Sequence, residues 1–277
     1  MKSSLLCMLL WVLGCGVTLS VRAECVQDYH LISDFDDTIK TYRWENFYNV
    51  AREAFFTHTI NAGIDTLYNE MLKQSTDPDC YLELNSNNDL FTVLSKSPKL
   101  VRGPIKSFFR KNKLPRPYLF VRGFFNFLNF GENYKLKKLR KRAQQKKVPF
   151  ILIGDDTSID NKVYHQFSNR YPQRVLDIYI HNITNARGYT GQIKYITAFE
   201  VALNEYLNQR LTAEAVLKVG QTILRAKHRA IIPPYGFCPL EPLQHQITNS
   251  DIIDAMANKI TELVHGICHK RNHLKRD

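Results

Sequence analysis

The sequence has little glycine and proline, and it lacks a long apolar run. Glycine and proline account for 23 of the 277 residues, too few for a low-complexity chain. The mean hydropathy of −0.31 excludes a polytopic membrane protein. Apolar residues make up 44% and charged residues 23%, values that exclude a disordered chain. A chain of 277 residues is long enough to bury a sizeable core. No internal repeat and no clear linker is visible, so this length predicts one or two domains.

Residues 1–23 have the pattern of a secretory signal peptide. One lysine precedes an apolar stretch at residues 5–17, and Val21 and Ala23 are the small residues expected before a cleavage site. The apolar stretch is too short to favour a spanning helix. We therefore expect cleavage near Ala23 and a secreted or periplasmic protein. The alternatives are an uncleaved anchor and a lipoprotein attached at Cys15, although the residues before Cys15 are not in the favoured order.

Four cysteines follow the predicted signal peptide, an even number that permits two disulfides in an exported chain. Three pairings are open, and the alternative is four partly buried thiols. No Cys-x-x-Cys pair occurs, which argues against a zinc ribbon. The four residues are Cys25, Cys80, Cys238 and Cys268.

Strands and helices are predicted to alternate over most of the chain. Apolar runs predict strands at residues 29–33, 90–94, 117–121, 149–153 and 175–180. Helical patterns separate them, at residues 43–74, 99–113, 135–147 and 158–170. This alternation implies parallel pairing and predicts an α/β doubly wound sheet flanked by helices. We expect a main domain at residues 24–190, and a mainly helical extension packed on it at residues 191–277.

An acidic cluster follows the first predicted strand. Residues 34–38 read Asp-Phe-Asp-Asp-Thr. In an extended chain, residues two apart share a face, so Asp34 and Asp36 can address one centre. Two carboxylates this close stay ionised only with a cation between them, and Mg²⁺ prefers such oxygen ligands. The alternative is a solvated acidic turn.

A second acidic cluster, Asp155, Asp156 and Asp160, follows the fourth predicted strand. If the two strands are neighbours, the clusters meet at the carboxyl edge of the sheet, where open α/β sheets bind ligands. Phosphoryl transfer also needs donors and cations, which Ser95 and Lys135 could supply. Either residue alone is uninformative, since most serines lie in turns and most lysines are solvated.

Four features occur in the order found in the haloacid dehalogenase (HAD) superfamily, which the chain therefore resembles. They are the Asp34-x-Asp36-x-Thr38 motif, Ser95, Lys135 and the second acidic cluster with Asp155 and Asp160. Residues 29–185 resemble more closely the catalytic domain of the actin-patch phosphatidate phosphatase family, through segments 33–40, 94–98, 152–155, 160–164 and 178–180. This resemblance implies a Rossmann-like sheet and Mg²⁺-dependent removal of phosphate from phosphatidate. The chain departs from the family pattern without losing a core catalytic group, at Lys99, residues 156–158 and Asn161.

The resemblance also implies roles for individual residues. Asp34 would be the nucleophile that forms an aspartyl phosphate, and Asp36 would protonate the leaving alkoxide and then activate water. Thr38 and Ser95 would orient the phosphoryl group, while Lys135 would offset its charge.

The implied metal site uses both clusters. Mg²⁺ would bind Asp34 and Asp155, with Asp160 in or near the shell and Asp36 contributing its backbone carbonyl. Asp156 is a candidate substitute ligand.

Residues 96–147 are strongly basic, with 17 lysine or arginine residues and one acid, Glu132. An aromatic segment within them includes Phe124, Phe125 and Phe127, which we interpret as a membrane-binding rim of the site. One alternative is a small aromatic core beneath a solvated basic helix. Single-stranded nucleic acid is another, but no RNP or OB pattern is present, so we expect no nucleic-acid partner.

His265, His269 and His273 are spaced by four near the C-terminus. They could bind a metal, although a solvated basic helix end is favoured.

The sequence therefore predicts an exported, Mg²⁺-dependent phosphatase that acts on phosphatidate or a related anionic phospholipid at a membrane surface. Its alternatives are a phosphatase of soluble phosphomonoesters and a catalytically weak protein that binds lipids or polyanions. The sequence does not predict an oligomeric state.

Overall fold

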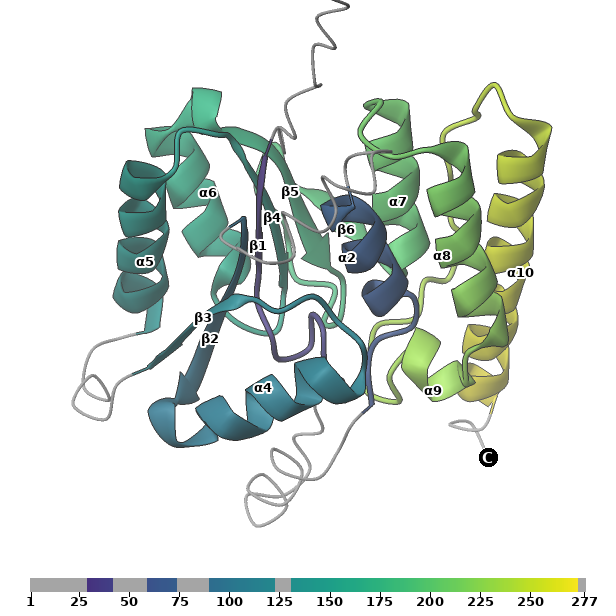
Figure 1. Cartoon of the computed structure of the whole chain (residues 1–277). Helices are drawn as coiled ribbons and strands as arrows, with labels where there is room; N and C mark the ends of the chain where they lie inside the picture. The colour runs from purple at the N-terminus through teal and green to yellow at the C-terminus, as the bar shows by residue number, and fades with distance from the viewer. Residues whose placement is uncertain (1–28, 42–58, 74–89, 123–130, 274–277) are drawn as a thin grey trace, which may run out of the picture.

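The fold is built on one six-stranded sheet. The computed structural model describes residues 29–41, 59–73, 90–122 and 131–273 (Figure 1). All neighbouring strands are parallel, in the order β3-β2-β1-β4-β5-β6, as the alternating sequence pattern predicted. The strands are β1 (His30–Ser33), β2 (Phe91–Pro98), β3 (Tyr118–Arg122), β4 (Phe150–Asp155), β5 (Val175–His181) and β6 (Ile193–Tyr195).

The two central strands, β1 and β4, are buried along their whole length. Successive side chains of a strand point to opposite faces of a sheet. Leu31 accordingly lies in the core on one face, and Ile32 lies in the core on the other. A strand that is covered on both faces is largely apolar, as in the Phe-Ile-Leu-Ile run of β4. In β1 the buried polar side chains of His30 and Ser33 form hydrogen bonds with Thr92 and Tyr68.

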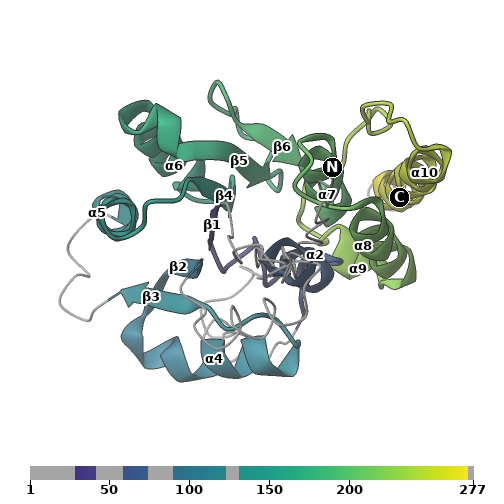
Figure 2. The same cartoon turned by 45° about the horizontal axis from the view of Figure 1, so that its top comes forward.

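Helices cover both faces of the sheet (Figure 2). One face packs against α5 (Gly131–Gln145) and α6 (Asp160–Arg170). The other packs against α2 (Ile64–Leu72), α4 (Arg102–Lys111), α7 (Ala198–Leu207) and α8 (Ala213–Arg225). The long helix α10 (Asp251–His273) packs on the outside of α8. Shorter helices are α9 (His228–Ile231) and the 3₁₀ turns η1 (Lys99–Val101) and η3 (Pro172–Arg174).

The segment after residue 190 combines one strand with helices. Residues 193–195 form β6, an edge strand that pairs with β5 of the same sheet. Three residues are too short for a recognisable strand pattern, which is why the sequence indicated only helices there. The predicted helix at residues 43–74 coincides with α2 over 64–72, and residues 42–58 lie outside the described part. None of the described helices is long and apolar enough to cross a membrane.

A disulfide links the loop before α10 to α10 itself. Cys238 and Cys268 are bonded, with their Cα atoms 5.4 Å apart. This is one of the bonds that the sequence allowed, and the other two cysteines, Cys25 and Cys80, lie outside the described residues.

The strand order reverses direction between β1 and β4. From β1 the chain moves outward to β2 and β3, and it then returns to the other side of β1 to form β4. The connections after β1 and β4 therefore leave in opposite directions, which is the arrangement that opens a ligand site in a doubly wound sheet.

Candidate active site

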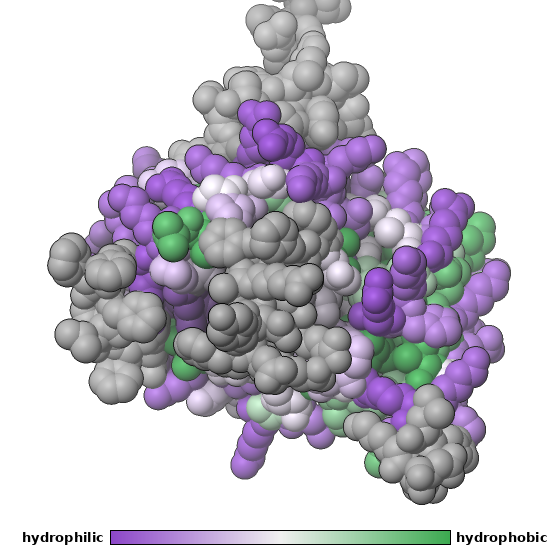
Figure 3. Space-filling model, turned by 90° about the horizontal axis from the view of Figure 1, so that it is seen from below, coloured by the Kyte–Doolittle hydropathy of each residue, from purple (hydrophilic) through white to green (hydrophobic). Residues whose placement is uncertain are grey.

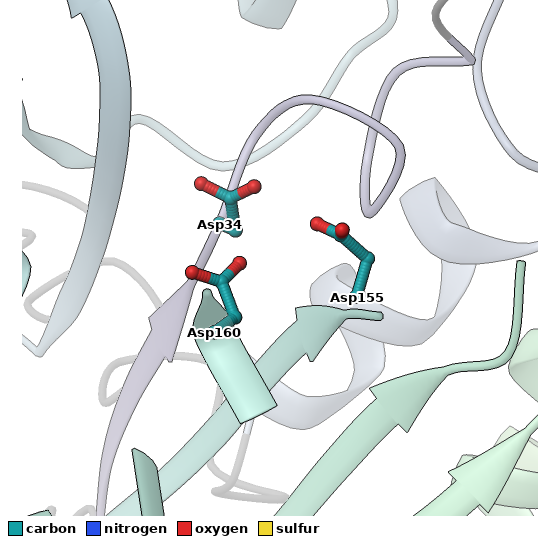
Figure 4. Close-up of side chains that lie close together, drawn as sticks. All are labelled: Asp34, Asp155 and Asp160. Atoms are coloured by element: carbon teal, nitrogen blue, oxygen red, sulfur yellow. The ribbon is translucent and has the colours of Figure 1, made fainter. Parts of the chain in front are cut away.

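Three buried aspartates meet at the carboxyl ends of β1 and β4. Asp34 directly follows β1, Asp155 ends β4 and Asp160 begins α6 (Figure 4). One carboxylate oxygen from each lies within 4.8 Å of the others. The two acidic clusters of the sequence meet because β1 and β4 are neighbours, with Ser33 paired to Ile153.

Lys135 lies among these carboxylates. Its side chain comes from α5 and has no exposed surface, and its Nζ donates to Oδ1 of Asp34 at 2.6 Å and to Oδ1 of Asp160. Desolvation by itself would lower the pKa of Lys135, but the surrounding aspartate charges outweigh this effect and raise it. Lys135 is therefore a permanent cation within the cluster.

Burial shifts the pKa of every carboxyl group in the cluster upward. It raises the pKa of Asp34 to about 7, against the opposing charge of Lys135. It also raises the pKa of Asp155 to about 7, with a further contribution from Asp160, whose own pKa rises to about 6. Without a further cation, the cluster thus resists full ionisation.

The residues of the cluster fit a divalent metal ion. When the three aspartates are ionised, the cluster and Lys135 together carry two net negative charges, which one divalent cation would balance. Among the described residues, Oδ2 of Asp160 is buried and has no hydrogen-bond partner. An all-carboxylate donor set suits a hard cation such as Mg²⁺. A Cβ at Gly154 would lie 2.8 Å from Cβ of Asp160, so the glycine allows this close approach.

Asp36 lies beside the cluster, with its side chain turned to β2. Its Oδ2 accepts a hydrogen bond from Oγ of Ser97 at 3.2 Å, and the backbone N–H of Ser97 donates to Oγ of Ser95 at 3.0 Å. Burial raises the pKa of Asp36, although the Lys40 ammonium opposes this shift. A raised pKa favours the protonated form that a general acid needs. Sequence reasoning assigned no role to Ser97, although it lies in segment 94–98, one of the segments that carry the resemblance.

Thr38 and Thr157 orient Asp155. The hydroxyl of Thr38 donates to Oδ2 of Asp155 at 3.3 Å, and the backbone N–H of Thr157 donates to Oδ1 at 2.8 Å. Asp156 points elsewhere, because it accepts backbone N–H groups from the segment that follows β5, namely from Ile183, Thr184 and Ala186 at 2.8, 2.8 and 3.0 Å. Asp156 shapes that segment and is not part of the three-aspartate cluster.

The catalytic loop, which we define as residues 34–40, turns sharply at Asp37. Asp37 is buried and has a positive φ of 57°, a conformation that few residues other than glycine adopt. Its carbonyl oxygen accepts hydrogen bonds from Nδ1 of His181 at 2.7 Å and from Nδ2 of Asn61 at 3.0 Å. Sequence reasoning missed both donors. The position of His181 at the end of β5 was the available signal.

The remaining sequence candidates lie away from this cluster or outside the described part. Phe124, Phe125 and Phe127 fall outside the described residues. His265 and His269 are exposed on α10, with ring centroids 6.3 Å apart. Within the described ranges, the three aspartates are the one group of at least three acidic, histidine or cysteine side chains arranged to hold a metal ion.

Hydrophilic side chains predominate on the described surface of the face toward which the carboxyl ends of the strands point. Figure 3 shows this side, and purple side chains make up most of its described surface, with smaller apolar areas between them.

Comparison with known proteins identifies a matching family. The family described as "Phosphatidate phosphatase APP1, catalytic domain" matches residues 29–182, more than half of the chain. This range contains Asp34, Asp36, Lys135, Asp155 and Asp160. No curated protein and no solved structure matches the chain.

Proposed function

Since the chain belongs to the family of the phosphatidate phosphatase APP1 catalytic domain, we propose that it removes phosphate from phosphatidate or a related phospholipid, with Mg²⁺ as cofactor. The observation that carries this proposal is the placement of Asp34 in contact with Lys135 and close to two further buried carboxylates, with Asp36 two residues away. This arrangement supplies a nucleophile, a separate proton donor and a means of holding a cation.

The proposed reaction has two steps. In the first, a carboxylate oxygen of Asp34 attacks phosphorus, the ester P–O bond breaks and Asp36 gives its proton to the leaving alkoxide. In the second, a water oxygen attacks phosphorus while Asp36 accepts a proton from that water. The bond between phosphorus and Asp34 then breaks, which releases inorganic phosphate and restores both carboxyl groups.

The other residues hold the phosphoryl group and balance its charge. Thr38 in the catalytic loop and Ser95 in β2 are both buried, and their hydroxyls could orient phosphoryl oxygens. Lys135 adds a fixed positive charge. A divalent cation held by Asp34, Asp155 and Asp160 would supply further positive charge for the phosphoryl oxygens.

A basic surface beside the site supports a membrane-bound substrate. η1 and α4 follow β2, whose Ser97 contacts Asp36. Residues 99–122 contain no acid, and Leu100 is 82% exposed although it is apolar. Exposed cations around an exposed leucine suit an anionic lipid surface. This surface, which we name the η1–α4 surface, consists of Lys99, Leu100, Arg102, Lys106 and Arg110.

Export is part of the proposal. The Cys238–Cys268 disulfide supports an oxidising compartment, and the signal-peptide pattern of residues 1–23 lies outside the described part. We propose a secreted or periplasmic enzyme on this basis.

Phosphate release from phosphatidate vesicles and from p-nitrophenyl phosphate, each with and without Mg²⁺, tests the function. We expect Mg²⁺-dependent release from the vesicles, and Asp34→Asn should abolish it because an amide cannot attack phosphorus. The control is Asp251→Asn, an exposed acid at the start of α10. Release from the soluble ester alone would favour a phosphatase of soluble substrates. Wild-type activity in Asp34→Asn would contradict the mechanism.

A further inference from the structure

The catalytic loop is held by a tyrosine that lies outside the matched family segment. The hydroxyl of Tyr235 donates to Oδ1 of Asp37 at 2.7 Å, across 198 residues of sequence. Asp37 lies between Asp36, the proposed general acid, and Thr38, which contacts Asp155. The family match ends at residue 182, so Tyr235 belongs to the segment that the match does not include.

The loop that carries Tyr235 is fixed on both sides. The guanidinium of Arg271 on α10 donates to the carbonyls of Pro233 at 2.8 Å, Pro234 at 3.1 Å and Gly236 at 2.5 Å. Cys268 is three residues before Arg271, hence on the same side of α10, and its disulfide holds Cys238.

This loop is also tied to the sheet side of the molecule. The backbone N–H of Phe237 donates to the carbonyl of Ile183 at 2.6 Å. The backbone N–H of Ala62 donates at 2.8 Å to the carbonyl of Ala230 in α9, the short helix that leads into the loop. The loop contacts the segment after β5, and α9 contacts the segment before α2; these two segments frame the catalytic loop. Its position is determined by α10, the disulfide and these two backbone contacts together.

We propose that Tyr235 is a positioning residue for catalysis, and that Arg271 and the Cys238–Cys268 disulfide hold it in place. A left-handed residue costs free energy and persists only where its surroundings hold it. Tyr235 anchors the side chain of Asp37, while His181 and Asn61 anchor its carbonyl. Loss of the hydroxyl allows the turn to relax, which shifts Asp36 relative to the phosphoryl site. The segment beyond residue 190 therefore completes the active site.

Tyr235→Phe tests this proposal, because it removes the hydroxyl and keeps the ring. In the full, oxidised chain with Mg²⁺, we expect kcat for an alkyl phosphomonoester to fall about 10- to 100-fold, the effect of one hydrogen bond to a charged group. KM should change less than about twofold, since the lost contact acts on the catalytic turn and not on the substrate. The matched control is Tyr171→Phe at the end of α6, on the opposite edge of the sheet.

Hydrogen exchange provides a readout that does not depend on activity. In the wild type, the amides of Asp37, Ile39 and Lys40 donate within the catalytic loop. We expect faster exchange of a peptide spanning residues 34–41 in Tyr235→Phe and an unchanged rate in Tyr171→Phe. Arg271→Gln should have the same two effects as Tyr235→Phe, faster exchange and a lower kcat, because it loosens the loop that carries Tyr235.

Two results would overturn the proposal. One is a Tyr235→Phe protein with kcat within twofold of the wild type and unchanged exchange over residues 34–41. The other is a rise in exchange over the whole protein, together with a large fall in melting temperature, in Tyr235→Phe and in Arg271→Gln. That result would assign Tyr235 to global stability. The proposal rests on the proposed phosphatase function, but the two fail differently. A wild type that releases no phosphate refutes the function, while the exchange data still decide whether Tyr235 holds the loop.

Discussion

The ammonium nitrogen of Lys135 lies 2.6 Å from Oδ1 of Asp34, and the Lys135 side chain has no contact with solvent. A lysine is rarely this buried unless it is paired. It is stable here because Asp34 and Asp160 both accept its hydrogen bonds. The contact keeps the proposed nucleophile close to a positive charge before any substrate binds.

Replacement of Lys135 by methionine tests this contact. We expect Lys135→Met to lower the free energy of unfolding by about 3 kcal/mol at pH 8, since it leaves ionised carboxylates buried without their partner. The loss should be smaller at pH 5, where the carboxyl groups are protonated. Urea denaturation at both pH values, without metal, measures the difference, with exposed Lys259→Met as the control. Equal losses at the two pH values would contradict the explanation.

Protons and Mg²⁺ should compete for the aspartate cluster. The pKa values of Asp34 and Asp155 are raised to about 7 from 3.8, so the metal-free fold favours their protonated forms. The stability that these groups contribute is full below about pH 4 and is lost as the pH rises through 7. Mg²⁺, which binds the ionised forms, should therefore raise the melting temperature more at pH 8 than at pH 5.5.

Thermal melts with and without Mg²⁺ at these two pH values measure the competition. Asp155→Asn is the control, because it removes one ligand and one titrating group together. If Mg²⁺ raises the melting temperature of Asp155→Asn as much as that of the wild type, the ion binds elsewhere.

Asp36 should matter most for esters with poor leaving groups. Asp36→Asn should lower kcat at least about 10²-fold on an alkyl phosphomonoester, the usual effect of losing an acid–base group. The first step should suffer less with p-nitrophenyl phosphate, because p-nitrophenolate leaves without protonation. Steady-state kinetics on both substrates provides the comparison. The burst of p-nitrophenol reports the first step. If Asp36→Asn slows this burst as much as it lowers kcat for the alkyl ester, the result argues against a proton-donor role.

The η1–α4 surface should control binding to lipid. Lys99→Glu and Arg102→Glu together with Leu100→Ser should weaken binding to phosphatidate vesicles at least about tenfold, since each cation near an anionic membrane contributes about 1 kcal/mol. Hydrolysis of a soluble ester should stay within about twofold. Vesicle co-sedimentation at low and high salt measures the effect.

The matched control carries the same change in net charge at Arg170→Glu and Lys259→Glu, two exposed positions on α6 and α10. Equal weakening by the two sets would attribute binding to net charge and not to this surface. The aromatic residues Phe124, Phe125 and Phe127 remain predicted lipid contacts, and their change to serine can be measured in the same assay.

The disulfide should contribute measurably to stability. Replacing Cys238 and Cys268 together by serine should lower the free energy of unfolding by about 2–4 kcal/mol, because the bond closes a 30-residue separation in the unfolded chain. Urea denaturation of the oxidised wild type and the double variant measures this. A thiol titration of the denatured, unreduced wild type should find these two cysteines blocked. Two reactive thiols at these positions would contradict the bond.

The sequence by itself determined which residues could form the sheet and the site. Mostly apolar runs of five or six residues had to be buried, and their alternation with helical patterns left a parallel sheet as the consistent arrangement. Asp34 and Asp155 stand directly after such runs, so their place at strand ends followed from local pattern alone. Ile193–Tyr195 escaped notice because three residues carry too little periodicity.

Only the tertiary structure decided which of these groups meet. Asp34 and Asp155 share a cluster because β1 and β4 are neighbours, a pairing that depends on the whole strand order. Asp156 resembles its neighbour Asp155 in sequence, yet the N–H groups after β5 bind its carboxylate instead. The contact between Tyr235 and Asp37 spans 198 residues, and no local pattern encodes it. Such pairings arise from packing over the entire chain, because each one is set by elements that are distant in sequence.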